Sequence, residues 1–298
     1  MKKAVVTGAA GFIGYHLCSR LLDEEVEVIG IDSAESSERI DMIARHAGFT
    51  YINDNIAACR LDKAARGCDA LFHLACQVKP SDPWEEIEKT AEKHLKILKK
   101  VLEAIKGKKV KLIYASAYDV YGKRQGEVSE SSPRNPENLF GLIKLTEENL
   151  IIDLAKKYKI PYVILRLPTV YGPGQPEDST YHQAIEARLK RKPPVLRKDN
   201  ITEDALYVDD AVESMWLAAA AKKQREIYNI HSGQKDAWQR GLQMLKVKPS
   251  SLPKEKRKMV VKGDKAAEEL GFKAAVPLRE GLKKQMSHIL SHLKREGT

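Results

Sequence analysis

The sequence of 298 residues lacks long apolar runs, metal-binding cysteine patterns and repeats, and each absence excludes a class of protein. No apolar run reaches the roughly 18 residues of a membrane-spanning helix, so we expect no contact with a membrane. The residues after Met1–Lys3 show a strand and glycine pattern and not the apolar stretch of an export signal. The cysteines show no metal-ligand spacing, which predicts free thiols in a reducing compartment and no metal site. They are Cys18, Cys59, Cys68 and Cys76. These absences together predict a cytoplasmic protein.

The formal net charge is +10, which raises the question of nucleic-acid binding. The lysines and arginines are spread over the expected helix faces and are not interleaved with aromatic residues. We therefore expect a solvated surface and no nucleic-acid partner, with anionic small-molecule substrates as a second explanation of the charge. A content of 43% hydrophobic and 31% charged residues is typical of a globular chain.

A glycine-rich stretch near the N-terminus is the most informative part of the chain. The apolar run Ala4–Val6 predicts a buried parallel strand, and Leu17 begins a helical period after three glycines. The first glycine allows a tight turn, the second lets the backbone approach a pyrophosphate, and the third lets the helix lie close to the sheet. The anion would rest on the free N–H groups of the helix N-terminus. We expect these loop residues to contact a dinucleotide: Gly8, Gly11, Phe12, Ile13 and Gly14.

An acidic residue follows the second apolar run, at the position where such proteins bind the adenosine ribose. The run 26–31 ends in Asp32, about 20 residues after the glycines. Its carboxylate would repel a 2′-phosphate, so the pattern favours NAD over NADP, and Arg39 is the nearby residue that argues otherwise. We expect Asn55 and Ile56 near the adenine. The remaining expected cofactor contacts in this half of the chain are Ser33, Leu74, Ala75 and Cys76.

Strands alternate with helices along the first part of the chain. Expected strands cover 49–52, 70–75, 110–115 and 162–166, and expected helices cover 60–67, 87–105 and 141–158. This rhythm predicts an α/β fold with a doubly wound parallel (Rossmann) sheet, and we place an NAD-binding domain at 1–170. From 171 on, proline and glycine break the pattern, which predicts a smaller α/β substrate-binding lobe over 171–298. The lobe is interleaved with the first domain, because 227–230 looks like a strand that returns to the sheet.

Several segments, in the right order, resemble those of one family. They are Thr7–Gly14, Phe72–Gln77, Val120–Gly122, Pro133–Pro136, Val170–Gln175, Tyr207–Asp210, Tyr228–Ile230, Ser232–Gly233 and Glu269–Phe272. The chain thereby resembles the extended short-chain dehydrogenase/reductases, specifically the NAD-dependent nucleotide-sugar epimerase/dehydratase family. The resemblance implies a Rossmann fold, NAD as cofactor, a nucleotide sugar as ligand and catalysis by transient oxidation of the sugar.

The chain departs from this family where protons are handled. In the family, a tyrosine of a Tyr-x-x-x-Lys pair takes a proton from a sugar hydroxyl, and a Ser or Thr shares that proton. The lysine lowers the tyrosine pKa and holds the nicotinamide ribose. Here the pair is Phe140 and Lys144, and the Ser or Thr position is Ala117. Both proton-handling hydroxyls are therefore missing.

Other groups are candidates to replace the missing base. Tyr118 and Asp119 occupy positions where family dehydratases often place an acid/base pair, so we expect them to face the substrate and form a rearranged proton pair. An ordinary rim tyrosine is the alternative interpretation of Tyr118. Cys76 is a weaker candidate, with a small buried hydrophobe as the alternative. We expect His73, in a buried strand, to be a core histidine whose polar atoms are satisfied.

Two expected substrate contacts also differ. The resemblance implies an asparagine where the chain has Thr169 and a phosphate-binding arginine where it has Glu203. An acid would repel a pyrophosphate unless Arg197, Lys198 or the basic cluster 254–258 compensates.

These observations leave three hypotheses. The first is a sugar-nucleotide-modifying enzyme of the epimerase or dehydratase type with a nonstandard or missing base. The others are a non-catalytic, NAD-bound regulatory or scaffold protein and a laboratory-inactivated epimerase. Family members commonly pair two helices into a dimer interface. We expect a homodimer through 86–105 and the apolar positions of the next helix, which are Leu142, Leu145, Ile151, Ile152 and Leu154.

Overall fold

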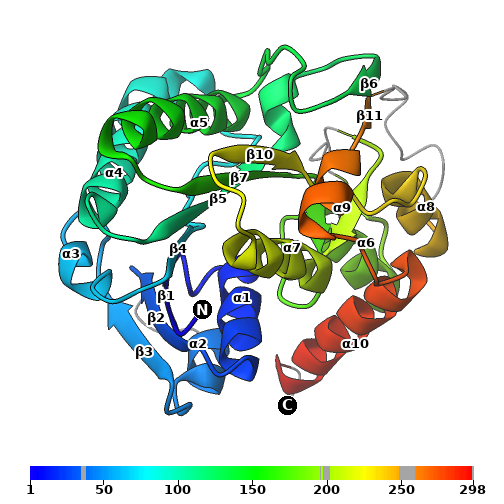
Figure 1. Ribbon diagram of the computed structural model, residues 1–298. Coiled ribbons are helices and arrows are strands. Elements are labelled where there is room, and N and C mark those ends of the chain that lie inside the picture. Colours follow the sequence, from blue (N-terminus) through cyan, green and yellow to red (C-terminus); the bar gives the residue numbers. More distant parts are fainter. Residues whose placement is uncertain (35–37, 195, 197–201, 248–258, 297–298) are drawn as a thin grey trace.

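A parallel sheet forms the centre of the molecule in the computed structural model, which describes residues 1–34, 38–194, 196, 202–247 and 259–296. Within these residues, seven strands pair in the order β10-β7-β5-β4-β1-β2-β3, and every neighbouring pair is parallel (Figure 1). The strands are β1 (Lys3–Thr7), β2 (Glu27–Asp32), β3 (Phe49–Asn53), β4 (Ala70–His73), β5 (Lys111–Ala117), β7 (Tyr162–Leu167) and β10 (Glu226–Asn229). The expected doubly wound parallel sheet is confirmed, and the expected strand at 227–230 joins its edge.

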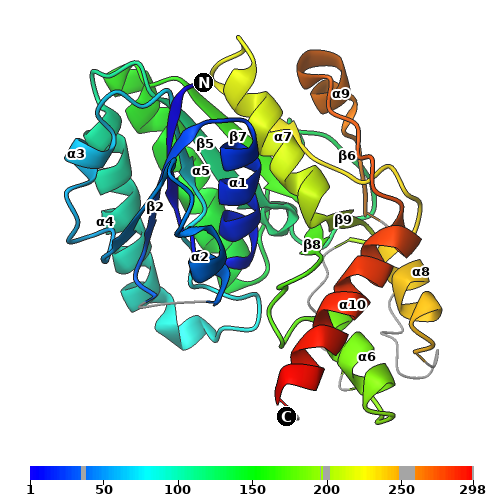
Figure 2. The same ribbon diagram turned by 90° about the horizontal axis from the view of Figure 1, so that it is seen from below.

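Helices cover both faces of this sheet (Figure 2). One face packs against α3 (Leu61–Ala64), α4 (Ile87–Ile105) and α5 (Leu139–Tyr158). The other packs against α1 (Phe12–Asp23), α2 (Glu38–Ile43), α7 (Val208–Ala220) and α9 (Asp264–Leu270). Their apolar stripes bury against the alternate faces of the strands, as parallel sheets require. In the part of the chain that the structure describes, no helix is long and apolar enough to cross a membrane.

A second group of elements lies beside the side of the sheet that is formed by the later strands, β5, β7 and β10 (Figure 1). It has its own core, in which Tyr171, Tyr181, Trp238 and Leu282 are buried together. Its two parallel strand pairs are β8 with β9 and β6 with β11. The elements are β6 (Gly126–Val128), β8 (Thr169–Tyr171), α6 (Thr180–Leu189), β9 (Ala205–Tyr207), α8 (Ala237–Met244), β11 (Met259–Val261) and α10 (Leu278–Glu296). The division into domains at residue 170 stays a prediction.

Among the element boundaries that differ from the expected ones are those of β4, α3 and α5. β4 ends at His73 and not at Ala75, because the chain leaves the sheet there and becomes the wall of a cavity. The helix expected over 60–67 is limited to Leu61–Ala64. α5 begins two residues before Gly141, because the Asn138 side chain accepts a hydrogen bond from the Gly141 N–H at 2.7 Å and caps the helix.

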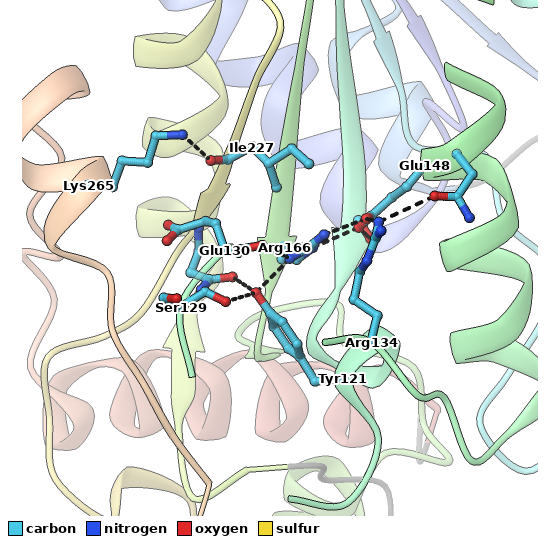
Figure 3. Close-up of polar contacts among 11 residues, drawn as sticks. Tyr121, Ser129, Glu130, Arg134, Glu148, Arg166, Ile227 and Lys265 are labelled. Carbon is cyan, nitrogen blue, oxygen red and sulfur yellow. Dashed lines mark hydrogen bonds and ion pairs between the residues drawn. The ribbon is translucent and has the colours of Figure 1, made fainter. Parts of the chain in front are cut away.

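A buried ion pair joins the end of the sheet to α5 (Figure 3). Arg166 on β7 has no exposed surface, and its guanidinium donates to both carboxylate oxygens of Glu148 at 2.9 and 2.7 Å. It also donates to the Tyr121 hydroxyl at 2.7 Å and to the Glu130 carbonyl at 3.1 Å. Ser116 donates to Glu148 at 2.6 Å. These bonds satisfy both charges and tie β5, β7 and α5 to the loop after Tyr121.

Candidate functional site

The glycine loop has the backbone geometry that an anion site needs. Gly8 adopts a φ of +77° directly after β1, which favours glycine. A Cβ on Gly14 would lie 2.0 Å from the Gly8 carbonyl oxygen, so α1 comes close to the loop only because this residue is glycine. Within the described residues, no side chain caps α1 at Gly11 and no acidic residue lies in its first turn. The N-terminal N–H groups of α1 are therefore suited to a phosphate.

Asp32 stands at the carboxyl end of β2, directly beside this loop. One of its oxygens accepts from the Ala10 N–H at 3.0 Å, and the other accepts from the Ser33 N–H at 2.8 Å. Arg39 donates to the carbonyls of Ala10 and Gly174, at 3.2 and 2.8 Å. The Arg39 guanidinium thus holds two backbone segments together, and the carboxylate of Asp32 is the charged group of the predicted ribose position.

A cavity of about 320 Å³ opens where β1, β2, β3 and β4 end. This is the edge at which doubly wound sheets bind their ligands. Its wall contains many of the expected cofactor residues: Gly8, Gly11, Asp32, Ser33, Asn55, Ile56, Leu74, Ala75 and Cys76. The other expected residues, Phe12, Ile13, Gly14 and Lys144, are outside the described wall. The sequence interpretation missed six wall residues, which are Ala10, Ala34, Gln77, Lys93, His94 and Ile97.

Lys144 and Phe140 lie in the first turns of α5. The Lys144 ammonium donates to the Ala115 carbonyl at 2.8 Å and lies 5.7 Å from the centre of the Phe140 ring. Phe140 and Cys76 both pack against the small apolar cluster of Val78, Leu139 and Ile143, which brings Phe140 beside the cavity wall. Ala117, at the end of β5, is 8% exposed.

The expectation that Tyr118 faces the substrate is wrong. Its side chain has no exposed surface, and its hydroxyl donates to the Ile230 carbonyl at 2.6 Å. Burial, with the nearby Asp204 charge, raises the pKa of Tyr118 well above its usual value, so it stays a neutral phenol. Asp119 accepts a hydrogen bond from the Asn138 side chain at 2.8 Å and thereby supports the start of α5. Tyr118 lies in the 3₁₀ turn over 118–121, which directs its side chain inward.

Cys76 and His73 are also poor bases. Burial raises the pKa of the Cys76 thiol, which keeps it protonated at neutral pH. His73 is buried as expected, and Nδ1 is 2.7 Å from the Thr7 hydroxyl. Its Nε2, however, has no hydrogen-bond partner among the described residues, so this histidine is only partly satisfied. Burial lowers the pKa of His73 to about 4, which leaves the ring neutral.

A polar cluster that the sequence interpretation missed lies between the cavity wall and the core. The Glu147 carboxylate accepts from the Tyr114 hydroxyl, and its other oxygen is 3.2 Å from Nδ1 of His94. His94 and Glu147 are 5% and 1% exposed. A signal was present in the sequence, since His94 falls on the apolar stripe of α4 three residues after Ala91 and four before Leu98.

Thr169 and Glu203, the two positions at which the resemblance implies other residues, lie near each other. β8 and β9 pair in parallel with Thr169 opposite Ala205, so Glu203 is close to the start of β8. The groups that were expected to compensate for its charge, Arg197, Lys198 and the cluster 254–258, lie outside the described residues. Among the described residues, no group of acidic, histidine or cysteine side chains could hold a metal ion.

The model of the NAD-dependent epimerase/dehydratase family matches residues 4–230. The chain belongs to this family. An uncharacterized UDP-glucose epimerase, YtcB of Bacillus subtilis, is 35% identical over 224 residues, covering 72% of this chain and 71% of the relative. Human dTDP-D-glucose 4,6-dehydratase is 27% identical over 240 residues, covering 77% of this chain and 69% of the relative. The membership agrees with the prediction of NAD as cofactor.

The similarity to solved structures covers nearly the full length of this chain. UDP-glucuronic acid 4-epimerase from Bacillus cereus, in complex with UDP-glucuronic acid and NAD, has a TM-score of 0.84 at 30% identity. The match covers 97% of this chain and 99% of that chain. The second group of elements therefore has its counterpart in an epimerase of known structure.

Proposed function

We propose that this protein is an NAD-dependent enzyme that transiently oxidises the sugar of a nucleotide sugar, as an epimerase or dehydratase with a nonstandard base. The observation that carries the proposal is the cavity at the ends of β1, β2, β3 and β4, which combines an uncapped helix N-terminus with the Asp32 carboxylate. Relatives named for UDP-glucose, UDP-glucuronic acid and dTDP-glucose support a nucleotide sugar as the substrate class.

The residues of the cavity fit NAD. The loop of Gly8, Gly11 and Gly14 would hold the pyrophosphate, with the N–H groups of Phe12 and Ile13 in the first turn of α1. Asp32 would bind the adenosine ribose, and Asn55 with Ile56 would line the adenine position. When bound, NAD supplies a hydride acceptor. Lys144, whose ammonium donates to the Ala115 carbonyl, would hold the nicotinamide ribose.

The proton side of the oxidation needs a group other than residues 117 and 140. Ala117 and Phe140 carry no ionisable atom, and Tyr118 is buried with its hydroxyl bonded to Ile230. An active enzyme must therefore accept the hydroxyl proton of the sugar on another residue of the cavity wall.

A non-catalytic, NAD-bound regulatory or scaffold protein is the second candidate. The observation that favours it is the combination of Phe140 and Ala117 with Glu203, which adds a negative charge where the family resemblance implies a phosphate-binding arginine. In that case the cavity holds NAD but nucleotide sugars bind weakly or without turnover.

One experiment separates the two candidates. The purified protein is incubated with NAD and, in turn, UDP-glucose, UDP-glucuronic acid and dTDP-glucose, and products are resolved by chromatography while NADH absorbance is followed. We expect conversion of at least one of these compounds, and we expect Asp32→Ala to reduce it at low NAD. Binding of NAD in calorimetry without conversion of any of them would favour the non-catalytic candidate.

A further inference from the structure

The polar cluster beside the cavity contains a carboxylate with both oxygens engaged. One oxygen of Glu147 on α5 accepts a hydrogen bond from the Tyr114 hydroxyl on β5. The other oxygen lies 3.2 Å from Nδ1 of His94 on α4. These residues come from three elements and meet where α4 and α5 pack over the sheet. The carboxylate is almost completely buried, so its position is fixed by these partners.

His94 connects this carboxylate to the cavity. The contact with Glu147 engages Nδ1, which leaves Nε2 as the ring nitrogen for a second partner. His94 contributes to the cavity wall together with Cys76 and Gln77, the residues that follow β4. A histidine that faces a ligand site with one nitrogen and a buried carboxylate with the other has the arrangement of an oriented general base.

The charge of Glu147 is maintained in spite of its burial. Burial raises the pKa of this carboxyl, but the hydrogen bond from His94 and the charge of Lys144 outweigh it and hold the pKa below its usual value. The carboxylate therefore stays negatively charged beside the His94 ring. The other titratable groups around His94 and Glu147 are Lys93, His73, Cys76, Tyr114 and Lys144.

We propose that His94 is the proton acceptor of the oxidation, with Glu147 as its positioning residue, in place of the hydroxyl missing at Phe140. This inference rests on the proposed function. The sugar carbinol would lose its carbon-bound hydrogen as hydride to bound NAD and its hydroxyl proton to Nε2 of His94. The products of the step are a ketone, the reduced cofactor and an imidazolium beside the Glu147 carboxylate, so charge and electrons balance.

The first test measures directly which ring nitrogen of His94 carries the hydrogen, and it needs no substrate conversion. Long-range nitrogen–proton NMR on the NAD-bound protein should show His94 with its hydrogen on Nδ1 and a bare Nε2 at neutral pH. Glu147→Gln should change this tautomer ratio, and Lys96→Gln, an exposed change on the same helix, should not. A hydrogen fixed on Nε2 in the unmodified protein would overturn the proposal, because that nitrogen could not accept a proton.

The second test measures conversion of the best nucleotide sugar found above. His94→Gln should slow it by about 10²–10⁴-fold, the usual contribution of a general base, with unchanged NAD affinity. Glu147→Gln should also slow conversion, because the carboxylate that positions the His94 ring is gone. Glu147→Asp should restore part of the rate, and Lys96→Gln should match the unmodified protein.

The failures of the two proposals are distinguishable. If His94→Gln converts the sugar as fast as the unmodified protein, or loses NAD affinity in proportion to its rate, His94 is not the base and the proposed function stands. If the unmodified protein binds NAD and converts no nucleotide sugar, the proposed function fails and the role of His94 fails with it.

Discussion

Lys144 has a defined position, one turn from Phe140, at which the family resemblance implies a tyrosine. Its ammonium donates to the Ala115 carbonyl and lies 4.9 Å above the centre of the Tyr114 ring, so partners from β5 hold it. Phe140 retains the volume of a tyrosine ring beside the cavity wall. At the scale of single residues, contacts from β5 and the cluster beside the cavity thus fix both Lys144 and Phe140.

Restoring those hydroxyls is the first prediction. In the His94→Gln protein, Ala117→Ser with Phe140→Tyr should raise nucleotide-sugar conversion by about 10²–10⁴-fold, because a phenol one turn from Lys144 would have a lowered pKa and could replace the lost base. Product formation from UDP-glucose and UDP-glucuronic acid measures the gain, with Phe140→Tyr alone as the matched control. An unchanged rate in the double variant, with NAD still bound, would show that the substrate anchor is lost as well.

Asp32 gives the second prediction. Asp32→Ala should weaken NAD binding by about 1–3 kcal/mol, the scale of a lost charged hydrogen bond, measured by calorimetry. Asp32→Asn keeps an acceptor for the Ala10 N–H but removes the charge, so it should also narrow the preference for NAD over NADP. Tighter binding of NADP than NAD by the unmodified protein would contradict the assigned role.

At the scale of helices and strands, the features that depend on local sequence patterns could be predicted, and the side-chain networks between distant residues could not. Apolar runs and glycine spacing are local, and they predicted the sheet and the cavity loop. The inward direction of Tyr118 depends on a 3₁₀ turn that the Val-Tyr-Gly pattern does not specify. The pair of His94 and Glu147 joins residues 53 positions apart, so it required the packing of α4 on α5.

The Arg166–Glu148 pair supplies a prediction about these elements. Arg166→Met should destabilise the protein by about 3–5 kcal/mol, because it leaves the Glu148 carboxylate buried without its main counter-charge. Urea unfolding followed by circular dichroism measures this. Arg166→Met with Glu148→Met should cost much less than the sum of the two single changes, since no charge is then buried unpaired. Equal stability of Arg166→Met and the unmodified protein would contradict the stabilising role assigned to the ion pair shown in Figure 3.

At the scale of the whole molecule, assembly stays a prediction. Ile151 is completely buried and Leu145 packs beside Tyr118, so two of the positions expected at a dimer interface belong to the core instead. Leu95 on α4 and Leu142 on α5 remain half-buried, whereas Leu154 packs against the core.

We expect a homodimer through these two helices. Light scattering at micromolar concentration should give twice the chain mass of 33.5 kDa, and Leu95→Glu with Leu142→Glu should give the monomer. Lys96→Glu, exposed on the same helix, serves as the charge control. A monomer mass for the unmodified protein would refute the expectation.

The edge position of β10 has a consequence for biosynthesis. Residues 226–229 complete the sheet by pairing with β7, but the chain first builds β8, α6, β9 and α7. A nascent polypeptide on the ribosome therefore carries an open β7 edge until this late segment emerges, and such edges recruit other chains. The unfinished protein is for that interval a client for chaperones, and a premature stop before Glu226 would release an aggregating fragment and not a smaller nucleotide-binding domain.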